Sequence, residues 1–243
     1  MSIAILCGSH DVAWRFTRYV MENYSFYVSF VEVERSNNIL SQVSINQRVR
    51  LSEYEDEDKT VRTIQELGVK TVVLAWWPKI VHKLNKLGIN VINTHPSYLP
   101  YNRGKHPYYW AIVDGTPFGA TIHRVDDGID TGEILWQKRV QLDPTDTGQT
   151  AYAKAASAMF ELLREHAEDI VHSRFPTAIK QDAARANHHF AKELEVPPIQ
   201  NKTEIAFIND LRARTFDNSR SGRKVVIDGI TYRIHLKLIE DNS

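Results

Sequence analysis

Three polar residues on two predicted strand ends form a group that could do chemistry. Asn93 and His95 lie two positions apart at the end of the apolar run that begins at Val91, and Asp130 follows in an acidic turn. Because strand side chains repeat every second residue, the amide and the imidazole lie on the same side of the chain. Acyl transfer needs a donor to an oxyanion, a group that moves a proton and a carboxylate that orients it. The spacing therefore predicts an acyl-transfer site.

Each of the three residues has an expected role in such a reaction. Asn93 would donate an N–H to the developing oxygen, and His95 would donate to the same oxygen or relay a proton near neutral pH. Asp130 would raise the proton affinity of the imidazole and fix its tautomer, directly or through water. Neither a metal ion nor a covalent nucleophile is required. His123, on the next strand, could belong to this group or be a buried structural histidine.

The elements that must position these residues alternate between strand and helix along the chain. Strands are predicted at residues 3–6, 26–33, 69–74, 89–93, 119–125 and 133–136, and helices at 11–22, 58–67, 81–88, 109–112 and 147–172. This order predicts an α/β fold with a doubly wound, mostly parallel sheet, whose ligands bind outside the carboxyl ends of the strands. Only Gly8 lies in the first turn, so the glycine fingerprint of a dinucleotide site is absent.

The chain is expected to have three parts. Residues 1–175 would form the catalytic domain, and residues 176–200, which lose periodicity, would form a connector. Residues 201–243 would add a helix at 203–214 and a β-hairpin that turns at Asp228-Gly229, a strong two-residue turn signal. An isolated hairpin is only marginally stable, so its apolar face must be covered by the main domain or by a second subunit. We therefore expect a homodimer.

Composition narrows the class of protein. The 30 basic and 30 acidic residues of the 243-residue chain cancel, which weighs against nucleic acid or an anionic membrane as the main partner. Cys7 is the single cysteine, so no disulfide can form within the chain, which fits a reducing compartment. No apolar run reaches about 18 residues. A protein of the cytoplasm is the expectation, and Cys7 is expected to be a small buried hydrophobe.

Several spaced motifs resemble those of one known family. Asn-x-His at residue 93, Pro-Ser-x-Leu-Pro at 96, the Arg-Gly pair at 103 and Ile-Asp-x-Gly at 129 are similar to the 10-formyltetrahydrofolate-dependent formyltransferases. The resemblance runs from the start of the chain to about residue 140. It implies that 10-formyltetrahydrofolate is the co-substrate and that Asn93, His95 and Asp130 have the catalytic roles given above.

The tail resembles one branch of that family. Its short helix and hairpin, with Leu211-Arg212-Ala213 and Gly222-Arg223-Lys224-Val225, are similar to the branch that formylates amino sugars carried on dTDP. The acceptor would then be a dTDP-linked amino-dideoxy sugar, with dTDP-4-amino-4,6-dideoxyglucose favoured. The resemblance further implies a role in making a surface polysaccharide such as the lipopolysaccharide O-antigen.

The resemblance also assigns binding residues. Folate would contact the segment that leaves the strand at 69–74 and the acidic turn; the residues are Trp77, Lys79, Ile80, Val81 and Asp126. The sugar nucleotide would contact the loop after His95, through Tyr101, Asn102, Arg103 and Lys105. Arg and Lys are the side chains expected to bind a diphosphate. Which aromatic side chain stacks on the base stays open.

The same residues are also compatible with other functions. The core motif also occurs in formyltransferases that act on glycinamide ribonucleotide, on methionyl initiator tRNA and on UDP-linked amino-arabinose. The tail is short and has no dense basic block, which disfavours tRNA. A non-catalytic folate- or nucleotide-binding protein with a vestigial site is the alternative from another functional class.

Overall fold

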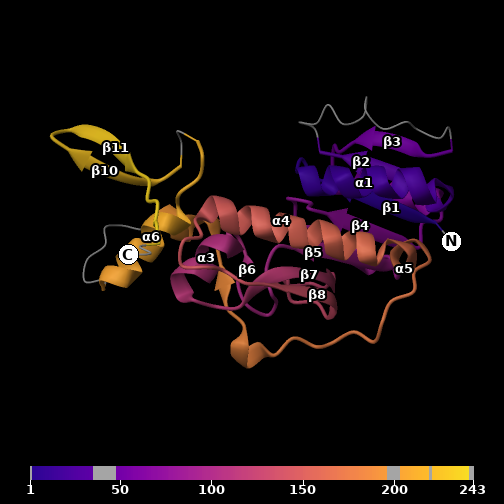
Figure 1. Ribbon diagram of the computed structural model, residues 1–243. Coiled ribbons are helices and arrows are strands. Elements are labelled where there is room, and N and C mark those ends of the chain that lie inside the picture. The colour runs from indigo at the N-terminus through magenta and orange to yellow at the C-terminus, as the bar shows by residue number, and fades with distance from the viewer. Residues whose placement is uncertain (1, 35–47, 196–202, 219–220, 241–243) are drawn as a thin grey trace. The chain divides into compact units, whose positions relative to one another are not determined.

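The computed structural model describes residues 2–34, 48–195, 203–218 and 221–240 (Figure 1). Parts of the polar stretch at 36–60, of the predicted connector and of the predicted tail lie outside these residues. The chain divides into two compact units that interleave along the sequence. Unit 1 comprises Met1–His95, Thr121–Lys138 and Met159–Gln181, and unit 2 comprises Pro96–Ala120, Arg139–Ala158 and Asp182–Ser243. Each unit is described by itself below.

The main sheet has seven strands in the order β3-β2-β1-β4-β5-β7-β8. Their bounds are β1 Ile3–Cys7, β2 Val28–Val33, β3 Arg50–Glu53, β4 Thr71–Ala75, β5 Asn90–His95, β7 Phe118–Arg124 and β8 Ile134–Val140. The first five strands run parallel, and β7 pairs antiparallel with β5. The predicted doubly wound, mostly parallel sheet is therefore confirmed. The edge strand β3 was not predicted, because it lies in a polar stretch and pairs on one side with β2.

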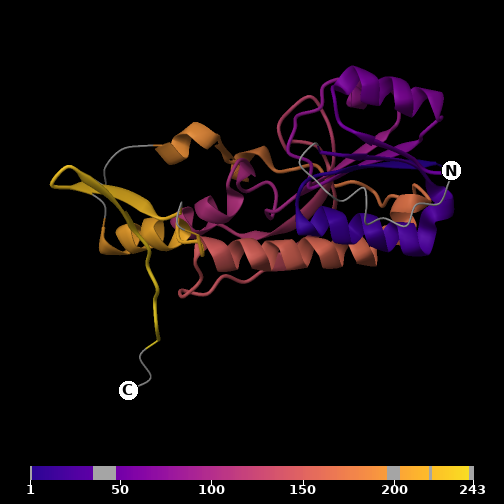
Figure 2. The ribbon, with the colours of Figure 1, turned by 90° about the horizontal axis from the view of Figure 1, so that it is seen from above.

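Helices cover both faces of the parallel strands. In Figure 2, α1 (Asp11–Tyr24) and α2 (Glu57–Glu66) lie on opposite sides of the sheet. Both begin at a side-chain cap, since His10 accepts from the Val12 N–H and Asp56 accepts from the Lys59 N–H. The strands between the helices are buried on both faces, as parallel strands must be.

The segment after β4 differs from the prediction. A helix at 81–88 was expected, but the structure has only the 3-10 turn η3 (Leu84–Lys86). Glu57 caps this turn, because its Oε1 atom accepts hydrogen bonds from the backbone N–H groups of His82, Lys83 and Leu84 at 2.6–3.1 Å. The turn does not extend into a helix, because Gly88, with a φ of 67°, ends the segment after a single turn.

The predicted helix at 147–172 exists but is interrupted. It consists of α4 (Gly148–Glu165) and α5 (Ala167–Val171), which meet at His166. The His166 ring stacks on Trp136 with centroids 4.4 Å apart, and burial lowers the pKa of this imidazole. Its role is structural. No helix in the described residues is long and apolar enough to cross a membrane.

Unit 2 has its own core around α3 (Pro107–Asp114). Tyr109, Ala111, Ile112 and Phe118 pack against Ala151 and Ala155 of α4 and Ala213 of α6 (Glu204–Ala213). Gly115 ends α3 with φ +65°, in the left-handed conformation expected of a helix cap. The 3-10 turns η4 (Ala183–Arg185) and η5 (Ala191–Glu195) and the short strands β6 (Arg103–Gly104) and β9 (His188–His189) complete the unit.

The predicted C-terminal hairpin is confirmed as β10 (Arg223–Ile227) and β11 (Ile230–Ile234). Asp228 and Gly229 have φ of 51° and 78°, as a type I′ turn requires. The register pairs Ile227 with Ile230 and Val225 with Tyr232, so one face of the hairpin is apolar. Ile227, Ile230 and Tyr232 on that face are 56%, 57% and 47% exposed in this single chain.

A buried ion network holds the tail to α3. Asp210 of α6 is 1% exposed, and its carboxylate accepts hydrogen bonds from the Tyr109 hydroxyl and from Arg214 and Arg223. The Arg223 contact, at 2.6 Å, joins the first residue of β10 to the helix. Two guanidinium groups and a hydroxyl compensate the buried carboxylate, which keeps the pKa of Asp210 low despite its burial.

Candidate active site

The three residues predicted from spacing converge in unit 1. Asn93 and His95 lie at the carboxyl end of β5, and Asp130 lies in the turn after β7. The His95 Nδ1 atom is 3.3 Å from Asp130 Oδ2, and Asn93 Nδ2 donates to Asp130 Oδ1 at 3.3 Å. A carboxylate in this position can orient the imidazole and hold the amide at the same time.

His123 belongs to the same group, which decides between the two roles open from the sequence. It pairs with Asn93 across β5 and β7, and its Nε2 atom lies 3.3 Å from Asn93 Nδ2 and 3.4 Å from Asp130 Oδ1. Its Nδ1 atom is 2.7 Å from the Arg124 carbonyl, which can only accept, so Nδ1 carries a proton. In neutral His123, Nε2 is therefore an acceptor for the Asn93 amide.

Burial strengthens the interactions in this group. The side chains of His95, His123 and Asp130 are 6%, 3% and 11% exposed. Charges and dipoles interact more strongly when water is excluded, so Asp130 can act on both imidazoles.

The thiol of Cys7, also in unit 1, is fully buried, and burial raises its pKa to about 11. Cys7 is thus the buried hydrophobe that was expected, since a thiol with this pKa is not a nucleophile near neutral pH.

The turn that carries Asp130 depends on a glycine. Asp130 itself has a φ of 53°, and Gly132 lies against β7. A Cβ atom on Gly132 would be 1.8 Å from the Arg124 carbonyl oxygen, so no other residue fits there. The Arg124 N–H donates to the Glu133 carbonyl at 2.9 Å, which closes the turn back onto the strand.

Gln181 holds the same turn from the connector. Its Nε2 atom donates to the backbone carbonyls of Asp130, at 2.9 Å, and Gly132, at 2.7 Å. One amide therefore fixes the residues on both sides of Thr131. Gln181 was not predicted to act here, because a single glutamine in an aperiodic segment carries no signal.

Asp126, assigned to folate by resemblance, stabilises the start of this turn. Its Oδ1 atom accepts from the Gly128 N–H at 3.1 Å and from the Thr131 hydroxyl at 2.5 Å. The side chain therefore has a local role in the geometry of the turn. Its contact with a ligand stays a prediction.

The carboxyl end of β4 is fixed by Thr94. The Thr94 hydroxyl accepts from the Trp76 N–H at 2.7 Å and donates to the Leu74 carbonyl at 3.1 Å. Trp76 has a φ of 50°, and its ring stacks on His10 with centroids 4.4 Å apart. Burial lowers the pKa of His10, so the neutral ring is favoured. These contacts set the direction in which the chain leaves β4.

The residues that follow divide into a buried and an exposed pair. Trp77 and Val81 are 8% and 7% exposed and belong to the core of unit 1, where Trp77 packs edge-on against Tyr54. Ile80 is 60% exposed, and Lys79 is also exposed, with its ammonium 5.2 Å from the Tyr54 ring centroid. Within the described ranges, the backbone N–H groups of Lys79, Ile80 and Val81 donate to no protein acceptor. An exposed apolar side chain beside unused N–H groups fits a flat heterocycle with polar edges.

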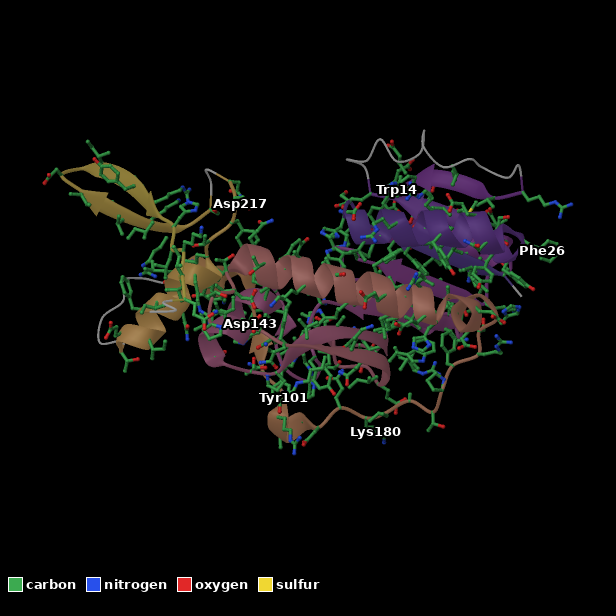
Figure 3. The ribbon with its side chains drawn as sticks, viewed as in Figure 1. Trp14, Phe26, Tyr101, Asp143, Lys180 and Asp217 are labelled. Atoms are coloured by element: carbon green, nitrogen blue, oxygen red, sulfur yellow. The ribbon has the colours of Figure 1, made fainter. Side chains whose placement is uncertain are left out.

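The loop predicted to bind the sugar nucleotide lies in unit 2. Arg103 is 7% exposed, Tyr101 (labelled in Figure 3) is half-buried and Lys105 is exposed. Asn102 is fully buried, has a φ of 55°, and donates through Nδ2 to the Thr116 hydroxyl at 2.8 Å. The side chain of Asn102 therefore supports the loop from inside.

Residues of the connector bind this loop, and this contact was not predicted. Asn187 and Asn102 exchange hydrogen bonds, since the Asn102 N–H donates to Asn187 Oδ1 at 2.5 Å and Asn187 Nδ2 donates to Asn102 Oδ1 at 3.1 Å. The Arg103 and Lys105 N–H groups donate to the Asn187 and His189 carbonyls at 3.1 and 2.9 Å. The His189 ring also stacks on Trp110 at 3.9 Å. The connector thus adds a short strand to the loop.

Comparison with known proteins assigns the family. The family model for formyl transferases matches residues 28–166, more than half of the chain and all of the group around Asp130. The chain belongs to the formyl transferase family. The resemblance read from Asn-x-His and Ile-Asp-x-Gly is therefore confirmed.

Relatives within this family include sugar enzymes. The dTDP-4-amino-4,6-dideoxyglucose formyltransferase of Mycobacterium tuberculosis is 33% identical over 151 residues, which are 58% of this chain and 64% of that relative. The matched part thus spans just under two thirds of the relative's length.

Solved structures extend the similarity over the whole chain. A Mycobacterium tuberculosis protein described as a sugar N-formyltransferase has a TM-score of 0.81 at 25% identity and covers 100% of this formyl transferase and 99% of its own chain. An N-formyltransferase of Helicobacter canadensis, solved with folinic acid and dTDP-3-aminofucose, has a TM-score of 0.72 at 16% identity, with 98% and 97% covered. At that identity the second similarity concerns the fold alone.

Proposed function

We propose that this protein transfers the formyl group of 10-formyltetrahydrofolate to the amine of a dTDP-linked amino-dideoxy sugar. Among such sugars we propose dTDP-4-amino-4,6-dideoxyglucose, the acceptor for which the Mycobacterium tuberculosis relative is named. The observation that carries the proposal is the convergence of Asn93, His95 and Asp130, with contacts of 3.3 Å from Asp130 to each of the others. The family assignment supports the reaction class, and the group supports a working site.

His95 moves the proton in this proposal. Asp130 faces Nδ1 of His95 at 3.3 Å, so the Nδ1 tautomer is favoured and Nε2 is the ring atom that exchanges a proton with the substrates. The attacking amine must lose a proton and the departing folate nitrogen must gain one. One imidazole can do both in turn, and the carboxylate stabilises it while it is charged.

Asn93 stabilises the oxygen on which negative charge develops. Its Nδ2 atom lies 3.3 Å from both His123 Nε2 and Asp130 Oδ1, and we infer that these two acceptors share one N–H while the second faces the formyl oxygen. A donor held in this way needs no reorganisation during the reaction. Loss of such a donor costs about 3–4 kcal/mol of barrier.

The folate supplies the formyl group, and residues 79–81 supply its walls. The exposed side chain of Ile80 offers an apolar surface, and the backbone N–H groups of Lys79 and Val81 offer donors to a pterin edge. Trp77 contributes indirectly, because it packs in the hydrophobic core that supports this segment. Asp126 contributes by shaping the turn that carries Asp130.

The sugar nucleotide contacts the loop of residues 101–105. Arg103 and Lys105 read the diphosphate, because a guanidinium binds phosphate through two parallel N–H groups and an ammonium adds a point charge. Tyr101 offers a ring and a hydroxyl to the base or sugar. Asn102 keeps the loop in shape through Thr116 and Asn187.

The remaining parts of the chain have proposed roles as well. Residues 1–175 carry catalysis, residues 176–200 connect, and residues 201–243 make a homodimer through the apolar hairpin face that contains Ile227 and Ile230. We place the reaction in the cytoplasm, which is supported by one unpaired cysteine, and assign its product to a surface polysaccharide.

The deciding experiment measures release of tetrahydrofolate from 10-formyltetrahydrofolate with defined acceptors. Turnover with dTDP-4-amino-4,6-dideoxyglucose, and a formylated product by mass spectrometry, is the expected result. Turnover confined to glycinamide ribonucleotide, UDP-amino-arabinose or methionyl initiator tRNA would reassign the acceptor. Folate and nucleotide binding without turnover with any acceptor would contradict the enzyme and favour a binding protein.

A further inference from the structure

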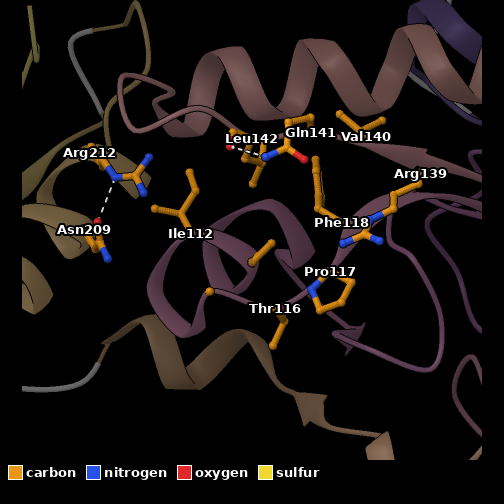
Figure 4. A pocket seen from close by; sticks show the side chains of 12 residues that line it. Ile112, Thr116, Pro117, Phe118, Arg139, Val140, Gln141, Leu142, Asn209 and Arg212 are labelled. Carbon is orange, nitrogen blue, oxygen red and sulfur yellow. Dashed lines mark hydrogen bonds between the residues drawn. The ribbon is translucent and has the colours of Figure 1, made fainter. Parts of the chain in front are cut away.

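Unit 2 contains a cavity of about 300 Å³ that the proposed reaction does not use. It lies between the end of α3, the start of β7, the end of β8 and α6 (Figure 4). Ile112, Phe118, Val140 and Leu142 give it apolar walls, and Arg139 and Arg212 are its charged residues. Tyr101, Arg103 and Lys105 do not line it, so it is separate from the loop proposed for the sugar nucleotide.

Arg212 presents a fixed cation to this cavity. Its Nε atom donates to Asn209 Oδ1 at 2.9 Å, and its Nη1 atom donates to the backbone carbonyls of Asp143 and Asp146 at 3.3 and 2.8 Å. In the part of the chain that the structure describes, Nη2 has no acceptor. The guanidinium is half-buried, and burial lowers its pKa, so it gains more from an anion than an exposed arginine would. Neutral acceptors thus hold the group, and a pair of N–H donors remains.

Arg139 adds a second positive charge. Figure 4 shows its guanidinium beside Phe118 and Pro117, at the opposite end of the cavity from Arg212. Among the described residues, neither arginine is within ion-pair distance of a carboxylate. The nearby carboxylates of Asp143 and Asp146 instead bind Lys154, at 2.8 and 2.7 Å.

The balance of charge at the cavity is positive. The carboxyl end of α3 contributes about half a negative charge, and the two guanidinium groups contribute a full positive charge each. The lining is mixed, since polar side chains such as Gln141 and Asn209 stand beside the apolar ones, which suits a ligand that joins a charged group to an apolar one. A volume of about 300 Å³ is at the lower limit for small-molecule sites, which suits one ring and one charged group.

We propose that this cavity binds a small anion in which a phosphate or carboxylate group is joined to one flat apolar ring. The anionic group lies against Arg212 Nη2, and the ring lies between Ile112, Phe118 and Leu142, with the charge of Arg139 beyond it. Nη2 donates charge-assisted hydrogen bonds to either oxyanion, and the ring displaces water from the apolar part of the lining.

Titration calorimetry of the full chain with phenyl phosphate tests this site without turnover, so the result does not depend on the proposed reaction. Binding is expected to weaken at least tenfold in Arg212→Lys, which keeps a charge but loses the Nη2 donors, and in Leu142→Trp, which fills the cavity. It should weaken by a smaller factor in Arg139→Gln, which removes the more distant charge. Arg233→Gln, which removes an exposed arginine of the hairpin, is the matched control and should bind as the unaltered chain does.

Three further titrations separate the parts of the proposal. Inorganic phosphate and phenol should each bind at least tenfold more weakly than phenyl phosphate, since each lacks one half of the ligand. Equal binding of either would overturn the assignment. Loss of binding in Arg103→Gln with normal binding in Arg212→Lys would place the probe on the loop at 101–105 and overturn it too. Arg139 is exposed, so its variant tests the site even if Arg212→Lys folds poorly.

Discussion

The Nδ1 atom of His95 lies 3.3 Å from Oδ2 of Asp130, at the end of the strand on which Asn93 also lies. The same carboxylate is 3.4 Å from Nε2 of His123. Asp130 is therefore placed to control which nitrogen of His95 holds a proton, and the Asn93 amide, which donates to Asp130 Oδ1, holds the carboxylate in turn. The predictions below depend on this arrangement and on the segments that support it.

Replacing the central residues should abolish most of the activity. His95→Ala and Asn93→Ala should each lower kcat at least about 100-fold, because proton transfer and oxyanion stabilisation each contribute about that much. Asp130→Asn keeps the shape but not the charge, and should lower kcat by a similar factor with little change in Tm. His235→Ala, in the tail, is the control. Near-normal rates in both His95→Ala and Asn93→Ala would refute the mechanism.

Gln181 is predicted to be a positioning residue for Asp130. Gln181→Glu replaces the donor to two carbonyls by an acceptor, so the turn should shift and kcat should fall about 10- to 100-fold, as for a misplaced catalytic group. An imidazole that loses contact with a carboxylate binds its proton less tightly, so the acidic limb of the kcat/KM profile should also move to lower pH.

Lys180→Ala changes the exposed neighbour of Gln181 (labelled in Figure 3) and should leave both kcat and the pH profile unaltered. The opposite result would be a lower rate in Gln181→Glu that is fully explained by less folded protein, with an unshifted pH profile. Gln181 would then stabilise the fold without positioning the carboxylate.

Asn187 is predicted to act on the sugar nucleotide alone. Asn187→Ala removes the hydrogen bonds that hold Asn102, so the KM for the dTDP-sugar should rise about tenfold while the KM for 10-formyltetrahydrofolate stays nearly constant. Lys192→Ala, an exposed change in the same connector, is the control. Equal changes in the two KM values would contradict a role confined to the 101–105 loop.

The buried carboxyl of Glu32 should make the free energy of unfolding decrease as pH rises. This carboxyl is fully buried, and burial raises its pKa, although hydrogen bonds from Thr60 and Ser52 partly oppose the shift. The folded state therefore keeps the proton above the ordinary carboxyl pKa, and stability is lost as pH rises from that value through the raised one.

Glu32→Gln should remove this loss. The Tm of the variant should match the unaltered chain near pH 4 and exceed it at pH 8 by about 2–4 °C, the shift that about 1 kcal/mol produces in a chain of this size. Calorimetric melting between pH 4 and 8 measures it, and Glu53→Gln, on the exposed edge strand, is the control. A Tm difference that does not grow with pH would contradict the burial of a protonated Glu32.

The hairpin face is predicted to hold a dimer together. Ile227→Lys with Ile230→Lys puts two charges on the apolar face, and light scattering at micromolar concentration should then report a monomer where the unaltered chain is a dimer. Thr231→Lys, on the other face of the same strand, should leave the dimer intact. A monomeric mass for the unaltered chain would disprove this interface.

The sequence by itself determined the features that depend on neighbouring residues. Alternation placed Asn93 and His95 on one side of β5, Asp228-Gly229 set the type I′ turn, and Ile129-Asp130-x-Gly132 marked the turn that returns to the site. Short-range rules suffice there, because side-chain direction and turn geometry follow from the local backbone.

Only the tertiary structure decided the contacts between distant segments. Glu57 caps the 3-10 turn found where a helix was predicted, His123 joined Asn93 through strand register, and Gln181 and Asn187 came from a connector without periodicity. Each depends on a polar side chain that contacts a group far along the chain, and no local pattern encodes such a partner. The residues that support the site were identified only from the structure, whereas Asn93, His95 and Asp130 could be predicted from their spacing in the sequence.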